Sequence, residues 1–203
     1  MKFLSRKNFL PVIAGFGLFL SACTSSEKEK ISPAKQELTD PNGFRIYTIK
    51  KGSHYADNRE TGEIKTTKLS FSVLFDSSAV YKTIDPVNQF DINKLYGLSD
   101  CNSAHHSNSA RMGWCWVNNQ LEIHAYGYKN GMRNSEFITA IPIGKPVEMS
   151  IEMNDSTYLL RVGEKFAELP RGCSGQSNGY KLFPYFGGDE TAPHDIVVKV
   201  KDL

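Results

Sequence analysis

Residues 110–128 of the 203-residue chain read ARMGWCWVNNQLEIHAYGY, and this stretch decides the fold. Asn118 and Asn119 suit a two-residue turn, because asparagine tolerates the positive φ that a type I′ hairpin turn requires. Trp116 then lies opposite Leu121, and the apolar residues of both arms share one face. A register shifted by one residue would mix apolar and polar side chains on each face. The pattern therefore predicts a β-hairpin in this register.

The two faces of the predicted hairpin differ in composition. One face is apolar and holds Met112, Trp114, Trp116, Leu121, Ile123 and Ala125. The other face holds Arg111, Gly113, Cys115, Glu122, His124, Tyr126 and Tyr128. Gly113 lies opposite His124, and a residue without a side chain leaves room beside the imidazole. We expect the first face to be core, and the second to be either a solvated surface or a site.

Several other segments alternate apolar and polar residues with a period of two, as half-buried strands do. The clearest are 69–75, 147–153 and 196–200, and turn-forming clusters separate them. Only 88–96 suggests a short helical turn. Many strands with few helices predict an all-β fold, a two-sheet antiparallel sandwich.

The N-terminus has the parts of a secretory signal. Three basic residues precede an apolar run over 9–20, which is shorter than the roughly 20 residues of a spanning helix. The sequence LSAC at 20–23 resembles the lipobox of bacterial lipoproteins, and this implies cleavage before Cys23 and lipidation of Cys23. An ordinary signal peptide with a nearby cysteine is the alternative. Thr24 is not the aspartate of an inner-membrane retention signal, which favours the outer membrane.

These features divide the chain into a signal peptide (1–22), a lipidated cysteine with a flexible polar tether (23–40) and one sandwich domain (41–203). The full chain has a net charge of +2, and loss of the three basic residues of the signal leaves −1. The charge therefore gives no reason to expect nucleic acid as a partner. We expect a bacterial envelope protein that contacts the membrane only through its N-terminal lipid.

The C-terminal third carries a more specific pattern. Residues 146–171 read as a strand, a tight turn, a second strand and a third short run, and YKLFPYFGG (180–188) and HDIVVKVKDL (194–203) follow. This succession resembles the closing strands of concanavalin A-like and laminin G-like jelly rolls. The resemblance implies that the sandwich is a jelly roll of this kind, in which one concave sheet carries a ligand groove.

Two short segments resemble part of one enzyme family. EIHAY (122–126) and KLFPYFGG (181–188) are similar to the His-bearing and Tyr-bearing strands of alginate-lyase-like jelly rolls. The resemblance implies that Arg111 neutralises a uronate carboxylate while His124 and Tyr185 move the proton. The chain departs from the family because Arg111 lies closer in sequence to His124 and lacks acidic and second-arginine companions.

Our first functional hypothesis is a lipid-anchored protein that binds a glycan on one sheet face. Aromatic faces stack on sugar rings, while charged and imidazole groups hydrogen-bond hydroxyls and carboxylates. The candidate ligand-binding residues are Arg111, Glu122, His124, Tyr126, Lys181 and Tyr185. The alternatives are a lyase acting on a uronate-containing glycan, with Arg111, His124 and Tyr185 as its catalytic residues, and a structural or partner-binding lipoprotein.

Metal and cofactor binding have weak support in the sequence. His105 and His106 are adjacent on a polar loop but lack further ligands at suitable spacing. Asp189, Glu190 and Asp195 lack the regular spacing of an EF-hand. We therefore expect no metal and no cofactor.

Three cysteines remain in the domain, so at most one disulfide forms between them. Cys101 and Cys115 bracket the histidine loop, and we expect this pair first. Cys115 points to the polar hairpin face, however, so it could instead be the free thiol or pair with Cys173.

Overall fold

The computed structural model describes residues 38–60 and 62–203. The predicted signal peptide, Cys23 and nearly all of the tether lie outside the described residues. Within them, no helix has the length and apolar character needed to cross a membrane.

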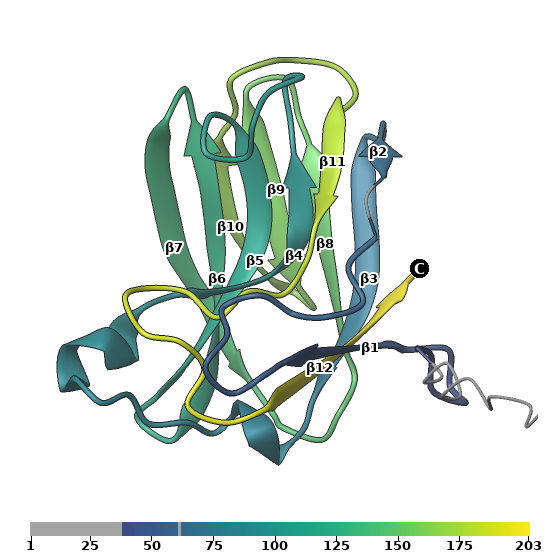
Figure 1. The fold of residues 1–203 in the computed structure, drawn as a ribbon. Coiled ribbons are helices and arrows are strands. Elements are labelled where there is room, and N and C mark those ends of the chain that lie inside the picture. Colours follow the sequence, from purple (N-terminus) through teal and green to yellow (C-terminus); the bar gives the residue numbers. More distant parts are fainter. Residues whose placement is uncertain (1–37, 61) are drawn as a thin grey trace, which may run out of the picture. The chain divides into compact units, whose positions relative to one another are not determined.

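The described residues form two antiparallel sheets that pack face to face (Figure 1). The first sheet has the order β1 (Arg45–Ile49), β12 (Ile196–Asp202), β3 (Lys68–Phe75), β8 (Val147–Met153), β9 (Thr157–Val162) and β10 (Lys165–Pro170). The second has the order β2 (Glu63–Ile64), β11 (Gly179–Leu182), β4 (Asn93–Ser99), β5 (Ser109–Val117), β6 (Gln120–Lys129) and β7 (Met132–Ile141). Two 3₁₀ turns, η1 (Ser77–Ala79) and η2 (Pro86–Phe90), lie between β3 and β4. The predicted two-sheet antiparallel sandwich is confirmed.

The hairpin of β5 and β6 has the predicted register. Trp116 pairs with Leu121 and Gly113 with His124. Asn118 and Asn119 both have positive φ, 52° and 58°, as the I′ turn requires. Period-two alternation together with the turn residues was therefore sufficient to set the pairing of these strands.

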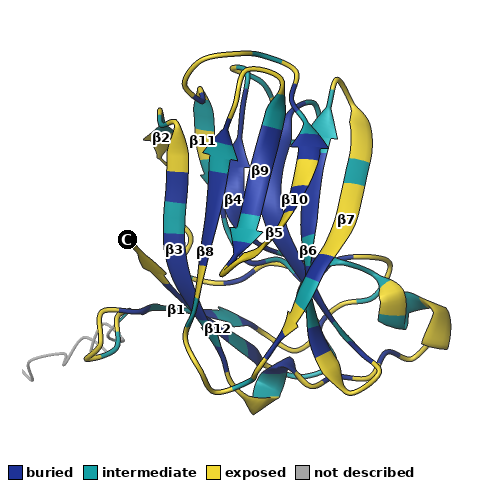
Figure 2. Cartoon of the chain, turned by 180° about the vertical axis from the view of Figure 1, so that it is seen from behind, coloured by how far each residue is buried: buried dark blue, intermediate teal, exposed yellow. Residues whose placement is uncertain are grey.

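The core lies between the two sheets, where Figure 2 shows the central strands as mostly buried. Trp114 is fully buried and packs against an aromatic group made of Phe75, Tyr81 and Phe186. The other apolar hairpin residues are buried as well, except Trp116, which is half-buried against the core. The alternating strands β3, β8 and β12 contribute the facing wall of the core.

The expected helical turn at 88–96 is wrong in its second half. Pro86–Phe90 forms the short 3₁₀ turn, with Asp85 as its N-cap accepting from the Val87 N–H. Strand β4 then begins at Asn93. Asn93 is buried, and its side chain accepts from the Gly187 N–H and donates to the Tyr81 hydroxyl, which holds the strand in place.

The expected Cys101–Cys115 disulfide is also wrong. Cys101 is bonded to Cys173, and Cys115 is a buried free thiol. The loop that carries Cys173 docks beside Asp100, because the Asn178 N–H donates to this carboxylate at 3.0 Å. Cys115 points instead to the outer face of the hairpin. A pairing across 72 residues depends on this loop packing and leaves no local pattern in the sequence.

Candidate functional site

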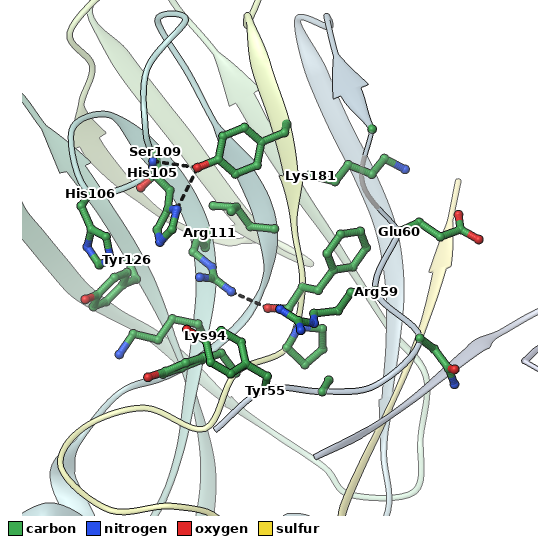
Figure 3. A pocket seen from close by; sticks show the side chains of 18 of the residues that line it. Tyr55, Arg59, Glu60, Lys94, His105, His106, Ser109, Arg111, Tyr126 and Lys181 are labelled. Carbon is green, nitrogen blue, oxygen red and sulfur yellow. Dashed lines mark hydrogen bonds between the residues drawn. The ribbon is translucent and has the colours of Figure 1, made fainter. Parts of the chain in front are cut away.

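A cavity of about 800 Å³ lies on the face of the second sheet that is turned away from the core (Figure 3). Strands β4, β5 and β6 form its floor, and the segments 55–60 and 180–185 form its walls. These two segments are tied together, since the Ala56 N–H donates to the Pro184 carbonyl and Tyr55 bridges to Tyr185. The polar hairpin face is therefore partly covered rather than a flat solvated sheet.

Arg111 lies at the centre of the cavity floor and is only 7% exposed (Figure 3). Its Nη2 donates to the Phe183 carbonyl at 2.6 Å, while its buried Nε has no partner among the described residues. None of the described carboxylates forms an ion pair with it. Burial lowers the pKa of Arg111 to about 10, so the group is still cationic at neutral pH. The cavity thus holds a buried guanidinium without a counter-charge.

Lys94 on β4 is a second cation on the same floor. Its Nζ lies 4.9 Å from the ring centre of Tyr126 and 5.8 Å from that of Tyr185. Burial and the nearby Arg111 lower its pKa to about 8. Two cations held close together in a half-buried site favour an anionic ligand, because each repels the other until a negative charge lies between them.

Aromatic rings form one side of the cavity. The ring of Tyr185 stacks on His54, with centres 5.3 Å apart and an interplanar angle of 9°, and meets Tyr55 edge-on at 4.9 Å. The guanidinium carbon of Arg59 lies over the Tyr55 ring, 4.7 Å from its centre. Burial raises the pKa of Tyr185. Rings fixed in this way offer apolar faces on which a sugar ring can stack.

The opposite side carries hydroxyl and imidazole groups. His105 Nδ1 lies 2.9 Å from the Tyr180 hydroxyl, which also accepts from the His105 backbone N–H. Burial and the neighbouring His106 lower the pKa of His105. Tyr126 and Tyr128 approach each other through their hydroxyls at 3.5 Å. These groups can exchange protons with a ligand or hydrogen-bond its hydroxyls.

Four of the six predicted ligand-binding residues line the cavity: Arg111, Tyr126, Lys181 and Tyr185. Glu122 and His124 do not. Lys181 belongs to β11, whereas Tyr185 lies beyond the end of that strand at Leu182. Lys181 pairs with Leu98 and its Nζ bonds the Asp202 carboxylate, so its charge is already neutralised.

The space expected beside His124 is filled. A Cβ added to Gly113 would lie 2.3 Å from Cγ2 of Ile92, a residue in the connection between η2 and β4. The glycine is required by this close packing and does not open a pocket. His124 instead lies near Cys115 and Glu122, on the same sheet face as Tyr126 but outside the cavity.

Sequence reasoning missed Lys94, Tyr55, Arg59 and the His105–Tyr180 pair as parts of one site. Lys94 lies on β4, between buried residues. The period-two alternation of apolar and polar residues is not visible there, because η2 ends just before the strand and a bulge lies between Lys94 and Gly97. Tyr55 and Arg59 lie in an irregular segment. The contacts of that segment with Pro184 and Tyr185 bring Tyr55 and Arg59 to the cavity.

Comparisons with known proteins agree on the fold. No protein-family model matches the chain. No curated protein matches its sequence either. Among solved structures, the alginate lyase AlyC3 matches with a TM-score of 0.55 and 11% identity, covering 80% of this chain and 74% of that one. SCLam, a non-specific endo-β-1,3(4)-glucanase from family GH16, matches with a TM-score of 0.52 and 11% identity, covering 78% and 69%. The chain therefore has a concanavalin A-like jelly-roll fold, as its C-terminal strands predicted.

Proposed function

We propose that the chain binds an acidic, uronate-containing carbohydrate in this cavity. The observation that carries the proposal is Arg111, a buried cation that faces the cavity without a carboxylate partner among the described residues. An arginine is suited to a carboxylate, because its planar group can donate two parallel hydrogen bonds.

The charges around the cavity support an anionic ligand. Two acidic residues also line it, but both are engaged: Asp57 accepts the Thr48 N–H at 2.7 Å, and Glu60 pairs with Arg45. The remaining free charges on the floor are cationic. The aromatic side formed by Tyr185 and Tyr55 supports a sugar rather than a small inorganic anion. The two fold relatives are named an alginate lyase and a glucanase, which is consistent with a carbohydrate ligand.

We expect Arg111→Met to weaken binding of uronate oligosaccharides by about 10- to 100-fold, since hydrogen bonds to charged groups contribute about 1.5–3 kcal/mol. Arg111→Lys keeps the charge but loses the planar pair of N–H donors, so we expect an intermediate loss of affinity. The measurement is calorimetric titration of the full-length chain in detergent, with neutral β-glucan oligosaccharides for comparison.

The matched control is Arg161→Met on β9, which removes a half-exposed arginine from the other sheet. Binding should not change. Equal affinity of the wild type for neutral and acidic oligosaccharides, or wild-type affinity of Arg111→Met, would show that this cavity does not recognise uronates.

A second candidate function is β-elimination on the same ligand, favoured by the His105–Tyr180 pair in the cavity that holds Arg111. A base would remove the proton α to the carboxylate, and an acid would protonate the leaving glycosidic oxygen as a C=C bond forms. Tyr185 lines the cavity and is retained as a proton-transfer candidate, whereas His105 replaces His124. Ultraviolet absorbance of the new C=C bond, followed in the same incubations, tests the lyase. Binding of the oligosaccharide without such absorbance would contradict the lyase activity and support a binding function alone.

We also propose that the chain is anchored in the bacterial outer membrane through lipidated Cys23. The proposal is supported by LSAC at 20–23 and the apolar run before it. In bacterial cells fed radioactive palmitate, the wild-type chain should be labelled and Cys23→Ser should not. Cys115→Ser is the control and should keep the label. An unlabelled wild-type chain would contradict the anchor.

A further inference from the structure

A second group of polar side chains lies on the outer face of the β5–β6 hairpin, apart from the cavity. Cys115 on β5 pairs in register with Glu122 on β6, and His124 follows two residues later on the same face. Cys115 is buried, while the side chains of Glu122 and His124 are 20% and 14% exposed. The three side chains therefore meet at a point that is shielded on the sheet side and open toward solvent.

Their donor atoms have the spacing of a metal-ligand set. Cys115 Sγ lies 3.5 Å from His124 Nε2 and 3.9 Å from a Glu122 oxygen, and that oxygen lies 3.3 Å from Nε2. A tetrahedral zinc with ordinary bond lengths separates its thiolate, imidazole and carboxylate ligands by roughly 3.3–3.6 Å. Two of the three distances fall within this range, and the third exceeds it slightly.

The arrangement does not fit a nucleophile activated by a charge-relay pair. In such a triad the acid holds one imidazole nitrogen while the other takes the proton of the nucleophile. Here the same nitrogen, Nε2 of His124, faces both Cys115 and Glu122. All three groups converge on a single point, as ligands do.

The regular pairing of β6 with β7 is interrupted at His124. The β6–β7 register shifts between Ile123 and His124, so that His124 lies opposite Phe137 and a bulge forms on β7. Bulges redirect side chains and are frequent beside functional sites. The Phe137 ring meets the imidazole edge-on at 5.5 Å and limits its rotation. On the neighbouring strand, Ile92 packs against Gly113, the residue paired with His124.

We propose that Cys115, Glu122 and His124 bind one zinc ion, leaving its fourth coordination position open to water or a ligand group. A thiolate, a carboxylate and a neutral imidazole balance the charge of Zn²⁺, and this mixed S, N, O set suits zinc better than magnesium or calcium. The site is independent of the proposed carbohydrate binding. It is distinct from the histidine loop at 105–106, where two adjacent histidines lack further ligands at suitable spacing.

The test uses the full-length chain in detergent, stripped of metal with a chelator and titrated with Co²⁺ as a spectroscopic substitute for zinc. We expect one Co²⁺ per chain, near-ultraviolet absorption from a thiolate–cobalt bond, and loss of that signal when Zn²⁺ displaces the cobalt. Cys115→Ser should abolish the thiolate absorption. Glu122→Gln should weaken binding at least about tenfold, since even outer-shell partners contribute that much.

The control is the double variant His105→Ala/His106→Ala, which should bind Co²⁺ like the wild type. Thermal melts of each metal-free variant check that it folds. If Cys115→Ser does not fold, the Co²⁺ titration of Glu122→Gln supplies the test. Added Zn²⁺ should raise the melting temperature of the wild type but raise that of Glu122→Gln much less. The proposal is overturned if the wild type shows no thiolate–cobalt absorption, if Cys115→Ser keeps it, or if only the double variant loses binding.

Discussion

Asp100→Ala should lower the free energy of unfolding by about 3–5 kcal/mol, the range for removing one partner of a buried ion pair. Asp100 and Arg171 have fully buried side chains, and Arg171 Nε donates to the carboxylate at 2.8 Å. The same carboxylate accepts from the Tyr158 hydroxyl and from two backbone N–H groups. Without it, the buried guanidinium loses its counter-charge and the acceptor of its Nε, and the other donors lose their acceptor. Urea denaturation followed by circular dichroism measures the change.

Two further variants test whether the loss of stability comes from the unpaired buried charge rather than from removal of any carboxylate. Asp195→Ala removes an exposed carboxylate that pairs with Lys50, and its stability should be close to that of the wild type. Asp100→Leu combined with Arg171→Met should be less destabilised than the sum of the two single changes, because no unpaired charge remains. A loss of less than about 1 kcal/mol for Asp100→Ala would contradict the role of this buried pair.

Cys173→Ala should lower the free energy of unfolding by about 4 kcal/mol in the chain-entropy model, because the Cys101–Cys173 disulfide closes a separation of 72 residues. The bond ties the loop after β4 to the loop after β10, beside the Asp100 group. Reduction of the wild type should have a similar effect. The measurement is urea denaturation with and without a reducing agent.

Cys115→Ala is the control, because its thiol is free. This variant should still lose stability on reduction, whereas Cys173→Ala should not respond to the reducing agent. Thiol labelling of the denatured, unreduced domain should modify Cys115 and spare the two bonded cysteines. Protection of Cys115 in the unreduced wild type, with labelling of Cys173, would show that the pairing is wrong.

Much of the sandwich could be predicted from local patterns. The alternation at 69–75, 147–153 and 196–200 corresponds to β3, β8 and β12. Alternation is a local property, since each apolar residue on a strand faces the core through its own backbone position. The segment 88–96 was less predictable because a 3₁₀ turn and a strand meet within nine residues.

The candidate site could be predicted only in part. Arg111, Tyr126, Lys181 and Tyr185 were expected and line the cavity, and Lys94 and Tyr180 were missed. The difference reflects how each residue reaches the site. Arg111 and Tyr126 share a hairpin whose register is local, and Tyr185 was expected only from the resemblance of its segment to a jelly-roll strand. Tyr180 reaches the cavity from β11, far along the chain, through packing that no local pattern indicates.

The stretch 110–128 separates the two kinds of information. By itself the sequence determined the hairpin, its register and the division into a core face and a polar face, because a two-residue turn and period-two alternation act between neighbours. Only the tertiary structure decided the use of the polar face. Ile92 filled the space at Gly113, Cys101 paired with Cys173 rather than with the expected Cys115, and the segments 55–60 and 180–185 enclosed Arg111. Each of these contacts joins residues distant in sequence, and their packing leaves no periodic signal along the chain.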